Sequence, residues 1–187
     1  MVPLASLWMP ILVSAVLVFF ASFLIHMVLR YHRGDYRKVA NEDAVQESLR
    51  RAAIPPGDYF LPHATGPEAM KDPAYVEKRN KGPIVLMTVI PGGPFSMGSQ
   101  LLQWFIYCVI VSVIAAYIAG RALPPAVEYL EVFRFAGTTA FVGYALALWQ
   151  NSIWYKKAWT TTLKQTIDGL IYGLLTGGAF GWLWPRV

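Results

Sequence analysis

The chain has 187 residues, of which 56% are hydrophobic and 14% are charged, and its mean hydropathy is +0.42. Soluble domains carry about a quarter of their residues as charged groups, so this composition excludes an ordinary soluble protein. The net charge of +5 is not a nucleic-acid signature, because the most charged segment, residues 30–98, holds ten Lys or Arg against eight Asp or Glu. We therefore expect membrane lipids around the chain and no nucleic-acid partner.

Four apolar runs approach the length of about 20 residues that a helix needs to cross the hydrocarbon core of a bilayer. They predict an all-α membrane protein, a bundle of four transmembrane helices with a long cytoplasmic loop between helices 1 and 2. The N-terminal transmembrane helix lies in residues 1–29 and the loop, with two short helices, in residues 30–98. A three-helix region follows in 99–187, with helices at about 101–119, 127–148 and 167–183.

The first run has an alternative interpretation as a signal peptide. Signal peptides begin with basic residues, and their apolar stretch spans about 7–15 residues. Here no Lys or Arg precedes the run, and it ends in the basic sequence RYHR at residues 30–33. We interpret it as the first membrane span, with its basic end in the cytoplasm.

The loop of residues 30–98 has few large apolar side chains, so we do not expect it to form a hydrophobic core. Asn41 is in position to cap one helix, and Asp72, followed by Pro73, caps a second that ends before Gly82. The apolar segment 84–90 is too short to span a membrane, and we interpret it as strand-like and interfacial.

Lys and Arg mark the cytoplasmic side of a membrane protein. They gather in the loop of residues 30–98 and in the third connection, which holds Lys156 and Lys157, and no Lys or Arg precedes the first span. This alternation predicts a multi-pass protein of the bacterial inner (cytoplasmic) membrane with both termini in the periplasm.

Glycines recur every fourth residue in the last predicted helix. Small residues at this spacing leave a groove along a helix that lets a second backbone approach closely. Three interpretations stay open: packing inside one bundle, a homo-oligomer built on the glycine face, and a glycine-lined pore. The expected helix-packing residues, including a matching series in the second span, are Gly169, Gly173, Gly177, Gly181, Ser112, Ala116 and Gly120.

Ionisable side chains inside membrane spans are costly and are candidates for function. His26 and Asp168 each lie four residues inside a basic cytoplasmic anchor, Arg30 or Lys164, and we expect them to meet across the bundle. The functional interpretation is a proton or ion relay, or a polar ligand site. The structural one pairs Lys164 with Asp168 and gives His26 a capping hydrogen bond. The rest of this candidate polar layer is Gln103, Gln150 and Tyr172.

A second group of charges lies near the predicted outer surface, at the start of the third span. Glu128, Glu131 and Arg134 form this outer charge cluster, and Glu131 is one helical turn from Arg134. Residues three apart on a helix can form an ion pair. We expect a satisfied interfacial cluster, with a substrate-binding charge as the alternative.

No motif for an enzyme or a cofactor is visible. Cys108 is the only cysteine, and His26, His32 and His63 do not fall at the spacing of metal ligands on a helix. No phosphate-binding glycine loop or nucleophile motif occurs. The sequence therefore predicts no catalytic residue, no metal site and no cofactor.

Segments PPGDYFLP, KGPIVLMTVIPGGPFSMG, AGTTAFVGYALALWQNSIWYKKAW and DGLIYGLLTGGAFGWLWP resemble those of a family of small four-span bacterial inner-membrane proteins with no assigned activity. The resemblance implies a bacterial cytoplasmic membrane and four spans, and it brings no site residues. We expect a structural or accessory membrane component that packs through its glycine helix, and not an enzyme. Its possible partners are further copies of the same chain, in a homo-oligomer, or other membrane subunits. The alternative is a small oligomeric channel or transporter.

Overall fold

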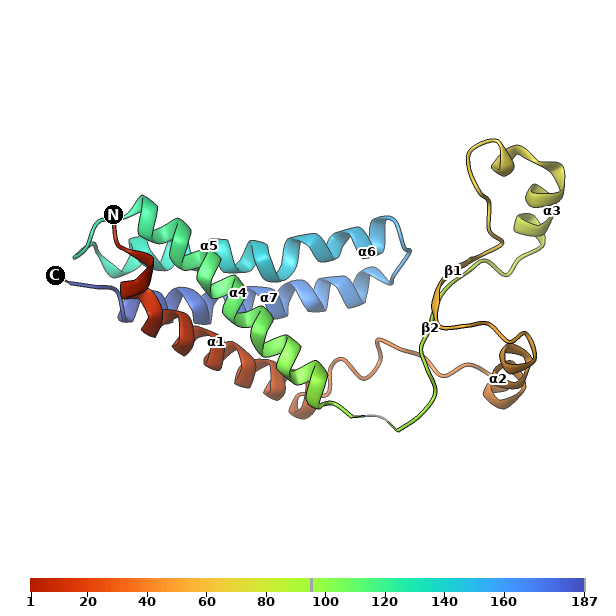
Figure 1. Cartoon of the computed structure of the whole chain (residues 1–187), viewed down its shortest axis with the longest axis horizontal. Helices are drawn as coiled ribbons and strands as arrows, with labels where there is room; N and C mark the ends of the chain where they lie inside the picture. Colours follow the sequence, from red (N-terminus) through yellow and green to blue (C-terminus); the bar gives the residue numbers. More distant parts are fainter. Residues whose placement is uncertain (95, 187) are drawn as a thin grey trace. The chain divides into compact units, whose positions relative to one another are not determined.

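A computed structural model describes residues 1–94 and 96–186 of the chain. The chain divides into two compact units, Met1–Arg37 with Ser96–Val187, and Lys38–Phe95. The first unit is a bundle of long helices, and the second holds short helices and a two-stranded hairpin (Figure 1). The protein is thus mostly helical, as the sequence predicts.

The bundle unit is built from helical stretches, and the second unit lies between the first stretch and α4 in the chain. A 3-10 turn precedes α1 and a π-helical turn follows it, while a 3-10 turn links α5 to α6. The bounds are Leu4–Leu7 for the first turn, Trp8–Phe23 for α1, Leu24–Val28 for the π turn, Gly98–Ala122 for α4, Tyr129–Ala145 for α5, Leu146–Leu148 for the second 3-10 turn, Trp149–Ile153 for α6 and Trp159–Trp182 for α7.

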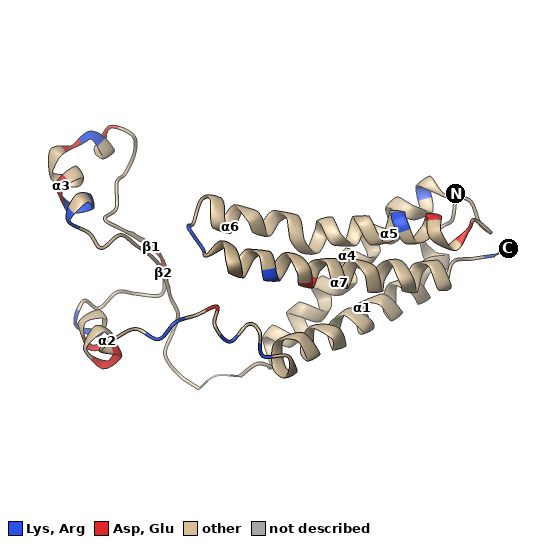
Figure 2. Cartoon of the chain, turned by 180° about the vertical axis from the view of Figure 1, so that it is seen from behind, with Lys and Arg blue, Asp and Glu red and all other residues tan. Residues whose placement is uncertain are grey.

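Three of these stretches, Leu4–Val28, Gly98–Ala122 and Tyr129–Ile153, are long and apolar enough to cross a membrane. Large apolar side chains such as Phe20 and Ile110 are exposed on the outside of the bundle. Charged residues are sparse along the bundle helices (Figure 2). An apolar exterior on a helix bundle is the signature of a membrane protein, because lipid takes the place of water around it.

The last helix, α7, begins at Trp159 and not near residue 167, where its apolar run begins. Its first turns are polar, but Thr161 and Thr162 are buried, and the Oγ atoms of Thr162 and Ser152 lie 2.7 Å apart. Polar side chains that bond inside a bundle do not end a helix, because the backbone hydrogen bonds continue past them. Apolar length alone therefore underestimated this helix.

Residues near both ends of the chain meet the α4–α5 connection at one end of the bundle (Figure 1). The Val2 amide donates to the Gly120 carbonyl at 2.8 Å, and the Ala126 amide donates to the Pro185 carbonyl at 2.9 Å. The Trp184 indole N–H donates to the Pro124 carbonyl at 3.1 Å. These contacts fasten residues near the chain termini to the end of α4 and to the α4–α5 connection.

The small residues of α4 face the first helical stretch. Ser112 accepts a buried hydrogen bond of 2.9 Å from Ser14, and Ala116 is fully buried. A β-carbon built on Gly120 would lie 2.8 Å from the Val2 carbonyl oxygen. Small side chains at these positions therefore allow α4 to approach α1 and the residues before it.

The glycine row of α7 lies against α5 of the same chain. A β-carbon on Gly173 would lie 2.9 Å from the Gly137 carbonyl oxygen, and one on Gly177 would lie 2.7 Å from the Phe133 carbonyl oxygen. At the two ends of the row, β-carbons on Gly169 and Gly181 would collide with Ala145 and Tyr129. The two backbones approach so closely that no side chain fits between them.

The second unit holds α2 (Glu42–Arg51), β1 (Gly57–Leu61), a 3-10 turn (Ala69–Lys71), α3 (Pro73–Lys81) and β2 (Val85–Val89). The strand-like segment at 84–90 contains β2, which pairs antiparallel with β1. Asp72 caps α3 by accepting from the Ala74 amide at 2.8 Å. Asn41 makes no side-chain cap and has a φ of 53°, so its predicted role is wrong. None of residues 38–94 is buried.

We predict that Gly177→Ala destabilises the bundle, whereas Gly178→Ala, the same change on the next residue of α7, does not. The added methyl group at 177 meets backbone atoms of α5, while the nearest atom to a β-carbon at 178 is the Tyr129 hydroxyl oxygen at 3.7 Å. Overpacking of this kind costs about 1–3 kcal/mol. Thermal unfolding in detergent gives the melting temperature of each variant. Equal melting temperatures for the two variants would contradict the close approach of α5 and α7.

Candidate functional site

A group of polar side chains gathers at the end of the bundle where the first helical stretch finishes. The Leu29 amide donates to the Leu24 carbonyl across the π turn, and Arg30 follows with a φ of 54°. This left-handed residue ends the helix, and two consecutive turns carry the chain through residues 30–35. Residues 31–35 are thereby brought against the side of α7.

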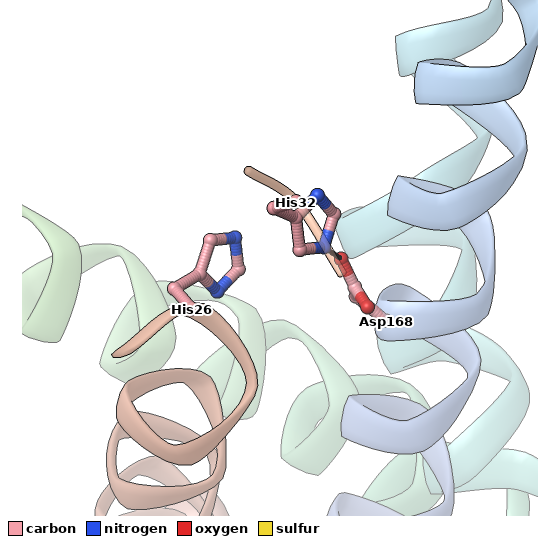
Figure 3. A group of neighbouring side chains, drawn as sticks. All are labelled: His26, His32 and Asp168. Atoms are coloured by element: carbon pink, nitrogen blue, oxygen red, sulfur yellow. Dashed lines mark hydrogen bonds and ion pairs between the residues drawn. The ribbon is translucent and has the colours of Figure 1, made fainter. Parts of the chain in front are cut away.

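Asp168 of α7 is the centre of this polar cluster. Its side chain is only 4% exposed, although it carries a carboxylate. The Tyr31 hydroxyl donates a hydrogen bond to one carboxylate oxygen, and Nε2 of His32 lies 2.9 Å from the other. Figure 3 shows the ring of His32 directed at Asp168 from the loop side. A buried carboxylate is tolerated when it is paired in this way.

Asp35 closes the cluster on the other side of the His32 ring. Its carboxylate lies 2.7 Å from Nδ1 of His32 and accepts a hydrogen bond of 2.8 Å from the Lys164 ammonium group. Lys164 also donates to the Tyr31 carbonyl oxygen at 2.7 Å. The ring of His32 therefore bridges two carboxylates, and Lys164 ties α7 to the loop.

These contacts shift the pKa values of two loop residues. Burial alone would raise the pKa of Asp35, but the hydrogen bonds from Lys164 and His32 outweigh it and hold the pKa below its ordinary value of 3.8. Burial and the neighbouring Asp168 carboxylate raise the pKa of Tyr31. Asp35 is thus an anion and Tyr31 a neutral hydrogen-bond donor at neutral pH.

His26 lies beside the cluster, at the end of the first helical stretch. Its ring stacks parallel to that of His32, with the centroids 4.6 Å apart. Its Nδ1 lies 3.0 Å from the Ser22 carbonyl oxygen, which can only accept, so Nδ1 carries the proton. Ligand atoms of His26, His32 and Asp168 all lie within 4.8 Å of one another (Figure 3).

The two titratable residues that were expected to meet, His26 and Asp168, lie in the same cluster. The Lys164–Asp168 pair that was expected beside them is not formed, because Lys164 turns to Asp35 and Asp168 to Tyr31 and His32. Loop acceptors at Lys164 and loop donors at Asp168 replace the helical i, i+4 contact.

The other members of the predicted polar layer do not join the cluster. Gln103 is exposed and donates to Ser99 of its own helix at 3.0 Å, and Gln150 is also exposed. Tyr172 is buried among aromatic rings, 5.4 Å from Tyr144 by ring centroids, and its hydroxyl group has no hydrogen-bond partner among the described residues. Equal depth along the bundle did not place these side chains on one face.

The outer charge cluster is not an ion-paired group. Glu131 and Arg134 are both exposed, and within residues 1–94 and 96–186 no salt bridge joins either of them to an opposite charge. The Glu131 amide donates to the Glu128 carbonyl in the first turn of α5. Exposed charges gain little from pairing, so solvation is an adequate alternative.

Sequence reasoning missed the roles of Tyr31, His32 and Asp35. These residues belong to the basic run RYHRGDYRK after the first span, which was interpreted only as a marker of orientation. The spacing of His32 and Asp35 fits a turn in which the two side chains meet. The positive φ at Arg30, which returns the chain to α7, has no signal in the sequence.

Comparisons with protein-family models, with curated proteins and with solved structures find no match.

We predict that Lys164→Met destabilises the bundle, because it leaves the Asp35 carboxylate and the Tyr31 carbonyl without their shared donor. A lost hydrogen bond to a buried acceptor costs about 1–3 kcal/mol. Lys156→Met is the matched control, since exposed Lys156 donates to the Ile153 carbonyl of its own turn. Unfolding in detergent should separate the two variants, and a Lys164→Met protein as stable as the control would exclude this anchoring role.

Proposed function

We propose that the chain is a four-span integral protein of the bacterial cytoplasmic membrane, with a structural or accessory role. The observation that carries the proposal is that the glycine row and the buried carboxylate of α7 both find their partners within the chain. Gly177 lies against Phe133 of α5, and Asp168 is bonded to Tyr31 and His32. A closed set of internal contacts suits a rigid scaffold.

The polar side chains of α7 support it as the fourth span, although three other stretches are the ones apolar enough by composition. Asp168, Thr162 and Thr176 are all buried inside the bundle, where lipid does not reach them. Polar residues that face a bundle interior lower the mean hydropathy of a helix without exposing polar groups to lipid. The helix can therefore cross the bilayer beside α5.

The contacts at one end of the bundle support an even number of spans. Val2 is bonded to Gly120 in the last turn of α4, and Pro185 is bonded to Ala126 in the α4–α5 connection that follows. Segments joined by a direct backbone hydrogen bond lie at the same depth of a bundle, which supports placing both termini on one side of the membrane. The basic residues at the opposite end, among them Arg30 and Lys157, favour the cytoplasm for that end and the periplasm for the termini.

A small oligomeric channel or transporter is the second candidate, and the glycine row disfavours it. A homo-oligomer was one of three interpretations of that row, but α5 of the same chain occupies it from Gly169 to Gly181. A second copy could use it only after α5 left.

Labelling of single cysteines tests the four-span arrangement. In a Cys108→Ala background, we expect a membrane-impermeant maleimide to label two exposed positions in intact cells and two others only after permeabilisation. The first pair is Pro125→Cys and Arg186→Cys, and the second pair is Arg37→Cys and Tyr155→Cys. Positions 155 and 186 labelled from the same side would show that α7 does not cross the membrane.

The mass of the unaltered protein in mild detergent separates the two candidate roles. A structural or accessory component should appear as one 20.9 kDa chain or with unlike subunits. A symmetric homo-oligomer that encloses a continuous lumen in electron microscopy would favour the channel and overturn the proposed role.

A further inference from the structure

We propose that His26, His32 and Asp168 bind a divalent transition-metal ion, with Zn²⁺ as the best fit. The three residues come from the π turn, from the loop after it and from α7, and they are separated by up to 142 positions in the sequence (168 − 26). No spacing rule applied to the sequence alone finds such a set. The inference departs from the sequence prediction that the chain has no metal site.

The ligand atoms are already close together. Nε2 of His32 and a carboxylate oxygen of Asp168 lie 2.9 Å apart, and the three candidate ligand atoms lie within 4.8 Å of one another. Zinc binds nitrogen and oxygen ligands at about 2.0–2.2 Å, which places neighbouring ligands about 3.3 Å apart. The His32 and Asp168 atoms therefore have to part slightly, and the exposed His26 side chain has to rotate out of its stacking on His32.

His32 is held as metal-binding histidines are. Metal-ligating imidazoles usually donate their second ring N–H to a carboxylate or a backbone carbonyl, which fixes the ring and directs the other nitrogen at the ion. Nδ1 of His32 lies 2.7 Å from the Asp35 carboxylate, and Nδ1 of His26 lies 3.0 Å from the Ser22 carbonyl oxygen. Nε2 of His32 is thus left to bind the metal, and Nε2 of His26 becomes available once its ring rotates.

The charge of the cluster also favours a cation. Once the proton that joins His32 to Asp168 has left, two carboxylates, Asp35 and Asp168, face one ammonium group, Lys164, and the three groups carry a net charge of −1 (1 − 2) beside two neutral imidazoles. The ion would take the place of the proton that joins His32 to Asp168. Tyr31 would keep its hydrogen bond to the second oxygen of Asp168 and so orient the carboxylate.

The donor set selects the class of ion. Two imidazole nitrogens and one carboxylate oxygen suit zinc and its neighbours in the first transition row, whereas Ca²⁺ and Mg²⁺ prefer oxygen ligands throughout. Three protein ligands leave at least one position for water, as in zinc sites that are not purely structural.

Titration of Co²⁺ into the full-length, EDTA-treated protein in detergent tests the site, because Co²⁺ reports its ligands by visible d–d absorption. We expect one Co²⁺ per chain, displaced by Zn²⁺ and not by Mg²⁺. His26→Gln should weaken binding at least about tenfold, and Asp35→Asn by about 10–100-fold with the same spectral shape. The matched control is His63→Gln, at an exposed histidine of the second unit, which should bind as the unaltered chain does.

Absence of a saturable band, or a band that survives His26→Gln and is lost in His63→Gln, would overturn the proposal. X-ray absorption at the zinc edge of the unaltered, zinc-loaded protein gives a test that depends on no variant. Two imidazoles with oxygen ligands support the site, and an all-oxygen shell or a single imidazole excludes it. The spectroscopic result is independent of the labelling and mass experiments, so either the metal site or the proposed role can be excluded without the other.

Discussion

A carboxylate buried among apolar helices must find hydrogen-bond donors, and Asp168 imposes this requirement on the rest of the structure. An unpaired buried charge is far more costly than any single contact in the bundle. The donors that meet the need, Tyr31 and His32, come from outside the helices. The loop after the first span is therefore folded back on α7, and Asp35 and Lys164 complete the attachment.

The second constraint is the close approach of α5 and α7. Glycines at every fourth position allow the α7 backbone to lie against the carbonyl groups of Phe133 and Gly137. Dispersion contacts between backbones at this distance replace the hydrophobic effect, which does not drive helix association in lipid. Because α7 is fixed against α5 along its length, Asp168 has one defined position, and the polar cluster can form around it.

The sequence predicted the helical class, the approximate helices and the residues of the glycine row, because apolar length and a small residue at every fourth position are local patterns. It also placed His26 and Asp168 at the same depth. It could not predict that Tyr31 and Asp35 join them, since that depends on the turn after Arg30. The start of α7 was missed because its first polar turns are satisfied by tertiary contacts, which a hydropathy profile does not register.

The most direct test of the central claim is a double-mutant cycle between Tyr31→Phe and Asp168→Asn, measured as free energies of unfolding in detergent with a chelator present. Direct contact predicts a coupling energy of about 0.5–3 kcal/mol. Tyr155→Phe, at an exposed tyrosine, replaces Tyr31→Phe in the control cycle and should show no coupling. Strictly additive effects of Tyr31→Phe and Asp168→Asn would contradict the claim that the loop satisfies the buried carboxylate.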